Sequence, residues 1–211
     1  MELTHKNYHS IEMNRKYMSQ SQFKSFLPQY GGCEAKAMAK LTGEYVDPDN
    51  DVFLLGGYVH AWNSGDLQDF MVDNPSLFKR DGSLYNKYAI GDLMIEVLRK
   101  DPMVEKAREG DKEVIMTGEL FDMPWKIMID IYNPKLGVFT DLKTCREIHR
   151  TYWNEDLRER QNFIDYWGHD VQMAVYAEIE RQQRSGEGYF APHVIAVSKE
   201  NPPDKEIFHF I

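Results

Sequence analysis

Cysteine is scarce in this chain of 211 residues, which contains only Cys33 and Cys145. The two are far apart and form no C-x-x-C pair, so one chain cannot supply a zinc ribbon or a four-cysteine iron–sulfur cluster. No apolar run approaches the length of a membrane-spanning helix, and the first residues lack the apolar core of a secretion signal. We therefore expect a soluble protein of the reducing cytoplasm, without a membrane segment.

Positive charge is also in short supply, because 25 Lys and Arg face 34 Asp and Glu, for a formal net charge of -9. Nucleic-acid binding depends on Lys and Arg that neutralise phosphates, so this composition argues against a nucleic-acid partner at face value. A bound divalent metal or a local basic groove would weaken that objection. The candidates for such a groove are Lys36, Lys40, Lys79, Arg80 and the stretch 146–160.

A phosphate-binding loop of the form G-x-x-x-x-G-K-[ST] is absent as well, which excludes ATP-driven unwinding by this polypeptide. The length, with 42% hydrophobic residues, is enough for one sizeable core. We expect a single domain over 1–211. Residues 1–105 are predicted to be mainly helical, and 106–211 to hold the sheet and a long helix.

Helical patterns dominate the first half of the sequence. Helix propensity, serine caps and apolar spacing predict helices after Ser19, over 33–41, over 54–71 with a break at Gly65, and over 89–99.

The apolar period changes from residue 113 onward. Strands are predicted over 114–120, 125–132 and 138–144, with turns between them, and closing strands over 193–198 and 206–210. A long helix is predicted over 152–185, with a buried stripe of Phe163, Ile164, Trp167, Val171, Ala174, Val175 and Ile179. Because a strand, a helix and a strand follow in this order, a crossover onto one sheet is expected. The fold class is therefore α/β (α+β), with a central mixed sheet flanked by helices.

Two aspartates and a lysine on neighbouring strands suggest phosphodiester chemistry. Asp141 and Lys143 are two residues apart in a strand, so their side chains leave the same face. Asp130 ends the preceding strand, and a hairpin can bring both carboxylates to one Mg²⁺ or Mn²⁺ ion. Lys143 could then orient or deprotonate the attacking water, or neutralise charge at the phosphate.

The alternative is that both aspartates are solvent-facing strand residues and that Lys143 is their salt-bridge partner. An acid-x-Lys triplet alone is common in a chain with this much charge. However, Asp130 follows the apolar stretch 127–129, and Asp141 lies among Val138, Phe139 and Leu142. Acids that enter a core need a partner or a metal, and this favours the site.

Five segments resemble, in order, the PD-(D/E)XK nuclease superfamily, and within it the RecB-like and RecE-like phage exonucleases. They are MSQSQFKSF at 18–26, GYVHA at 57–61, KIMID at 126–130, DLKT at 141–144 and QMAVY at 172–176. The resemblance implies a restriction-endonuclease-like core with an N-terminal helical segment.

In that family a histidine, two acids and one backbone carbonyl bind the metal. The resemblance assigns these roles to His60, Asp130, Asp141 and the carbonyl of Leu142, and it makes Lys143 catalytic. Taken alone, a single histidine on a helix is more often a structural residue than a ligand. An imidazole ligand would suit Mn²⁺ as well as Mg²⁺.

Three further residues are predicted around the site. The resemblance implies that Gln172 and Tyr176, one helical turn apart, support the site or the DNA, although they could equally mark an amphipathic boundary. Glu119 could be a further acid near the metals or a surface residue.

The sequence therefore predicts a Mg²⁺- or Mn²⁺-dependent DNA exonuclease. The resemblance implies phage-type resection of duplex ends in recombination or repair, with a single-strand annealing protein as partner and a ring-shaped homo-oligomer. One alternative is a non-catalytic nucleic-acid or protein-binding module on a nuclease fold. Another is a hydrolase of a small phosphorylated molecule, which the charge of -9 would favour.

Overall fold

The chain is known from a computed structural model that describes residues 2–48, 51–184 and 188–210. It forms two compact units, each built from three separate segments. The first unit contains 1–48, 115–129 and 149–190, and the second contains 49–114, 130–148 and 191–211. Whether the chain behaves as one domain stays a prediction. In the described parts, no helix is both long and apolar enough to cross a bilayer.

The first unit begins with three short helices, α1 (Ile11–Lys16), α2 (Gln20–Phe26) and α3 (Glu34–Thr42). The predicted helices correspond to α2 and α3, and the hydroxyl of Ser19 accepts from the Gln22 N–H at the start of α2. The sequence did not predict α1, where Ser10 makes the same kind of cap. Single turns of 3₁₀ helix add His5–Asn7 and Pro28–Tyr30 here, and Pro75–Leu77 and Asn86–Tyr88 in the second unit.

The prediction of one long helix over 152–185 is wrong, and its final residue lies outside the described part. The chain instead forms the hairpin β4 (Tyr152–Asn154) and β5 (Glu159–Gln161), then α8 (Phe163–Tyr166) and α9 (His169–Gln183). Gly168 separates the two helices with a left-handed φ of 62°. Trp167, predicted to be buried, is 43% exposed.

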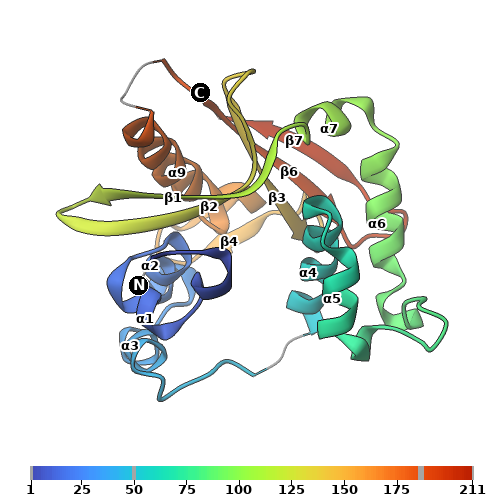
Figure 1. Cartoon of the computed structure of the whole chain (residues 1–211), viewed down its shortest axis with the longest axis horizontal. Coiled ribbons are helices and arrows are strands. Elements are labelled where there is room, and N and C mark those ends of the chain that lie inside the picture. Colours follow the sequence, from blue (N-terminus) through green and yellow to red (C-terminus); the bar gives the residue numbers. More distant parts are fainter. Residues whose placement is uncertain (1, 49–50, 185–187, 211) are drawn as a thin grey trace. The chain divides into compact units, whose positions relative to one another are not determined.

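The second unit contains α4 (Asp51–Ser64), α5 (Leu67–Asp73), α6 (Ile90–Arg99) and α7 (Pro102–Ala107) (Figure 1). The predicted break at Gly65, where φ is 93°, separates α4 from α5. The short helix α7 was not predicted. Its first turn is capped by the Asp101 carboxylate, which accepts from two backbone N–H groups.

The sheet has the strand order β1-β2-β3-β6-β7, with bounds β1 (Asp111–Leu120), β2 (Met123–Asn133), β3 (Val138–Cys145), β6 (Ala191–Ser198) and β7 (Lys205–His209). Strand β3 pairs antiparallel with β2 and parallel with β6, and β6 pairs antiparallel with β7. The expected mixed sheet and the crossover between β3 and β6 are therefore confirmed.

The core of the second unit fixes the helix α4 against the strand β3. Val59 of α4, Met94 and Leu98 of α6, and Ile131 and Leu142 of the sheet are fully or almost fully buried in one apolar cluster. Because residue 60 follows the buried Val59, the packing of α4 determines where the imidazole is presented.

Candidate functional site

The hairpin of β2 and β3 brings the two candidate carboxylates to equivalent positions. Ile131 pairs with Thr140 as the last pair of the antiparallel ladder, so Asp130 and Asp141 are the next residues of the two strands beyond that pair. Opposite residues of an antiparallel pair send their side chains to the same face.

Asp130 is contacted by both Leu142 and His60. Its Oδ2 accepts the Leu142 N–H at 2.8 Å and lies 3.5 Å from Nδ1 of His60. Only 14% of its side chain is exposed. Burial raises the pKa of the Asp130 carboxyl, His60 opposes that increase, the charge of Asp141 adds to it, and Lys143 opposes it.

Asp141 forms an ion pair with Lys143, with 2.6 Å between Oδ2 and Nζ. The residue Asp141 is 3% exposed. The alternative in which both aspartates face solvent is therefore wrong for Asp141, although the salt bridge that it predicted is present. A buried carboxylate whose neighbour is a second carboxylate needs cations around it.

Leu142 contributes its backbone to the site while its side chain belongs to the core. The N–H and C=O of a strand residue point toward the same edge of the strand. Because the Leu142 N–H donates to Asp130, the Leu142 carbonyl lies on the edge that faces β2. This is compatible with a ligand role for the carbonyl, which stays a prediction.

The donor set suits a hard divalent cation. An imidazole from His60 and carboxylate oxygens from Asp130 and Asp141 match the preferences of Mg²⁺ and Mn²⁺. Burial, and to a lesser extent the charge of Asp141, raise the pKa of Asp130, and a bound cation would favour the ionised carboxylate. As placed, however, no three His, Cys, Asp or Glu side chains among the described residues converge closely enough to chelate an ion.

Gln172, Tyr176 and Glu119 belong to the first unit, and their predicted roles around the carboxylates stay predictions. Gln172 and Tyr176 are buried on α9, one turn apart. Glu119 has an exposed side chain, and its backbone N–H and carbonyl are both hydrogen-bonded to the side-chain amide of Gln182 at 2.9 Å. Its exposure fits the surface alternative at least as well as the acidic one.

Lys112 is a neighbour of the site that the sequence reasoning missed. Burial and the charge of Arg108 lower its pKa, Glu105 and Asp130 oppose that decrease, and the resulting value is about 8. In a hairpin of the predicted strands 114–120 and 125–132, the residues just before the first strand lie beside the end of the second strand. This pairing would have indicated that a residue near position 112 lies beside Asp130.

Comparisons with known proteins bear on the family and the fold of this chain. A family model described as a PDDEXK-like domain of unknown function matches residues 19–210. A crystal structure of a protein named "Putative exonuclease" from Eubacterium rectale has a TM-score of 0.92 and 38% sequence identity, over 100% of this chain and 79% of that one. A comparison with curated proteins gave no match.

Proposed function

Because the chain belongs to the PDDEXK-like family, we propose that it is a Mg²⁺- or Mn²⁺-dependent deoxyribonuclease that degrades duplex DNA from its ends. The family is described as PDDEXK-like and of unknown function, and PD-(D/E)XK nucleases generally use divalent metals. One observation carries the proposal, which is that two largely buried carboxylates and one ammonium group lie on the two neighbouring strands β2 and β3. Phage-type resection in recombination or repair is the setting that the sequence resemblance supports.

His60, Asp130 and Asp141, with the Leu142 carbonyl, are the residues that would hold the metal. When bound, the ion supplies Lewis-acid polarisation of the phosphate and activation of a water molecule. Asp141 would exchange part of its contact with Lys143 for the cation. The hydrogen bond from the Leu142 N–H fixes the orientation of the Asp130 carboxylate, so its remaining acceptor positions have a defined direction.

Lys143 would act electrostatically. Its side chain is 22% exposed, and its ammonium is fixed at Asp141 by the 2.6 Å ion pair. An ammonium at this position can donate hydrogen bonds to a phosphate oxygen and to the attacking water. It thereby stabilises charge that increases as the phosphodiester bond breaks.

The direct test incubates the folded protein with linear duplex DNA and Mg²⁺, Mn²⁺ or EDTA. Asp141→Asn and Lys143→Gln should each lower the cleavage rate by about 100-fold or more. Lys135→Gln is the matched control, because Lys135 is an exposed lysine in the turn of the same hairpin. An absence of cleavage by the wild type in both metals would reject the proposal.

The choice of substrate decides between the remaining alternatives. Covalently closed circular DNA should resist cleavage if the enzyme requires ends. Small phosphodiesters should fail to compete with duplex DNA, whereas effective competition would favour the small-molecule hydrolase. A binding module predicts that Asp141→Ala leaves both metal binding and the fate of DNA unchanged. A ring-shaped assembly and an annealing-protein partner remain parts of the proposal that rest on resemblance.

A further inference from the structure

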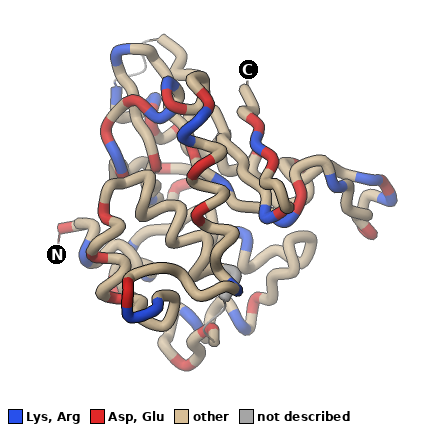
Figure 2. Tube along the Cα trace, turned by 90° about the vertical axis from the view of Figure 1, so that its right-hand side faces the viewer, with Lys and Arg blue, Asp and Glu red and all other residues tan. Residues whose placement is uncertain are grey.

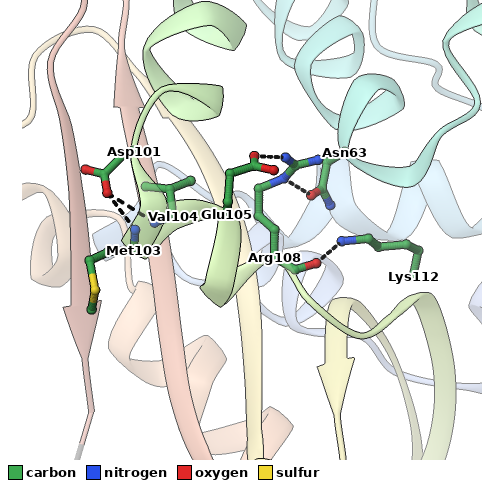
Figure 3. Close-up of polar contacts among 7 residues, drawn as sticks. All are labelled: Asn63, Asp101, Met103, Val104, Glu105, Arg108 and Lys112. Carbon is green, nitrogen blue, oxygen red and sulfur yellow. Dashed lines mark hydrogen bonds and ion pairs between the residues drawn. The ribbon is translucent and has the colours of Figure 1, made fainter.

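Three cationic side chains gather around the carboxyl end of α7 and the start of β1. The guanidinium of Arg108 lies 3.6 Å from the centroid of the Trp62 ring, and that of Arg99 lies 5.9 Å from it. The Lys112 ammonium donates a hydrogen bond to the carbonyl of Arg108 (Figure 3). This gives a concentration of positive charge in a chain whose net charge is -9.

Arg108 is held rigidly at the centre of this cluster. Its Nε donates to Oδ1 of Asn63 at 2.9 Å, and its Nη1 pairs with Glu105, as Figure 3 shows. Glu105 offsets one of the three positive charges. Asn63 is three residues after His60 on α4, so the two lie on neighbouring positions of one helix face. The helix α4 therefore carries both His60 and the Asn63 side chain that binds Arg108.

Lys112 extends the cluster toward the carboxylates. The negative charge of Asp130 raises the pKa of Lys112 against the opposite effects of burial and Arg108. The geometry supports this placement, because the side-chain amide of Asn133 donates to the Glu109 carbonyl at 3.0 Å, so the start of β1 runs beside the end of β2 that carries Asp130. The side chain is only partly buried. An ammonium has three N–H donors, and the contact with Arg108 uses one of them.

We propose that Lys112 binds a backbone phosphate of the nucleic-acid substrate beside the carboxylate site. The proposal rests on the proposed function. Cations that repel one another within a fold are stabilised by an anion bound among them, and a nucleic acid that enters this site carries phosphates on both sides of the scissile bond. Arg108 fixes the ammonium through its carbonyl, so Lys112 binds the phosphate as a pre-oriented charge.

Lys112 could instead serve only to satisfy the end of α7. Arg108 is the C-cap residue of that helix, and a lysine that donates to the last carbonyls favours a helix end. The two roles differ in what they predict for salt. A helix-capping lysine affects the stability of the fold, whereas a phosphate-binding lysine also changes the number of counterions released from DNA.

Binding of a fluorescent duplex oligonucleotide to the full chain, measured in EDTA over a range of NaCl concentrations, separates these roles. Lys112→Met should weaken binding by about tenfold and reduce the slope of log K against log[NaCl] by about 0.9, the value for one phosphate contact. Lys112→Arg should keep the slope of the wild type. Lys106→Met is the control, because Lys106 is an exposed lysine of α7. A wild-type slope and affinity in Lys112→Met would overturn the proposal.

Cleavage kinetics distinguish a failure of the Lys112 proposal from a failure of the proposed function. With Mg²⁺ or Mn²⁺, Lys112→Met should raise KM by about tenfold while kcat stays within about threefold of the wild type, because a contact with a phosphate other than the scissile one contributes uniform binding. If the wild type cleaves DNA but Lys112→Met has the salt slope of the wild type, the nuclease function is supported and the phosphate contact of Lys112 is rejected. If Lys112→Met has a reduced salt slope but the wild type does not cleave DNA, the phosphate contact is supported and the nuclease function is rejected. If thermal unfolding shows that Lys112→Met does not fold, Lys112→Gln replaces it, because its amide can still donate to Arg108.

Discussion

Asp130 carries a charge that the fold does not favour. Burial and the neighbouring charge of Asp141 raise its pKa, and His60, Lys143 and the Leu142 N–H only partly compensate. A residue kept in this state at a cost to stability is typical of a functional site. Removing the charge should therefore separate stability from activity.

We predict that Asp130→Asn abolishes cleavage but does not destabilise the metal-free protein. The amide oxygen can still accept the Leu142 N–H, while the desolvated charge is gone. In EDTA the Tm should equal or exceed that of the wild type, and metal-dependent cleavage should fall by about 100-fold or more. Asp111→Asn, at an exposed position at the start of β1, should change neither property. A clear decrease in Tm for Asp130→Asn would show that the charge stabilises the fold.

Lys126 is a second buried charge, and it belongs to the first unit. The residue is 1% exposed, and its ammonium donates to the carbonyl of Tyr8 and, at 2.7 Å, to Oδ1 of Asn14. Burial lowers the pKa of Lys126 to about 8 from its ordinary 10.5. Between these pH values the unfolded chain binds more protons than the folded chain, so this group makes the protein more stable as the pH rises.

Comparison with Lys126→Met isolates this contribution. The free energy of unfolding of the wild type, relative to that of Lys126→Met, should increase from pH 8 to 10.5 with a slope of up to about 1.4 kcal/mol per pH unit. His9, whose pKa is lowered by burial and by Lys126, is neutral throughout this range and does not contribute. Denaturant unfolding at several pH values measures the difference. A difference that is flat or decreases with pH would contradict a lowered pKa.

Sequence reasoning could group the candidate carboxylates with Lys143 but could not identify a buried charge such as Lys126, for a physical reason. Asp141 and Lys143 are separated by one strand period, and Asp130 is joined to them by a single hairpin, so local geometry places all three. The environment of Lys126 depends on Tyr8 and Asn14, which are both more than a hundred positions away in the sequence, and residue spacing does not reveal such contacts. Long-range contacts of this kind set burial and therefore pKa.

At the scale of elements, the error in the long helix over 152–185 has a definite origin. The apolar stripe continues across Gly168 at nearly helical spacing, although the glycine is in the left-handed region that ends a helix. Before that glycine, Asn162 begins the short helix α8, because its side chain accepts hydrogen bonds from two backbone N–H groups of α8. Capping and turn signals outweighed periodicity here, and the short strands β4 and β5 were missed with them, whereas the five strands of the main sheet were predicted.

Gly91 controls the contact between α6 and α4. A Cβ atom at this position would lie 2.9 Å from side-chain carbons of both Leu55 and Tyr58. The ring of Tyr58 cannot move freely, because its hydroxyl donates to Asp92 at 2.7 Å. We predict that Gly91→Ala destabilises the protein by about 1–3 kcal/mol, since overpacking exceeds the gain of about 1 kcal/mol in helix propensity.

The same substitution should reach the site through α4. Tyr58 lies two residues before His60, so a displaced α4 would move the imidazole away from Asp130 and slow cleavage. Leu93→Ala, at a position of α6 that is 41% exposed, is the control and should alter neither property greatly. Thermal unfolding and cleavage rates provide the measurements. A Gly91→Ala protein that is more stable than the wild type would mean that helix propensity prevails.

At the scale of the whole molecule, acidic and basic residues are interspersed along the trace (Figure 2). The net charge of -9 is therefore an average over patches of both signs. Arg99 and Arg108 at the Trp62 ring, with Lys112 bound to the Arg108 carbonyl, form one locally positive region, and its member Lys112 interacts electrostatically with Asp130. Total charge, which counts residues and not positions, could not have predicted it.

Metal binding should stabilise the whole chain if it behaves as one domain. Mn²⁺ or Mg²⁺ at about 100 times its Kd should add about 2.7 kcal/mol to the free energy of unfolding, which for a chain of this size raises Tm by about 5–10 °C. Asp141→Asn should lose this increase, while Lys135→Gln should retain it.

Calorimetry with and without the metal also tests the domain organisation. All of the proposed ligands lie in the second unit, whereas β1 and β2 each continue through both units. If the chain is a single domain, one cooperative transition should move as a whole when the metal is added. Two transitions, of which only one responds to the metal, would show instead that the units unfold separately. NaCl at matched ionic strength must leave the profile nearly unchanged, so that the increase reports a bound ion and not screening.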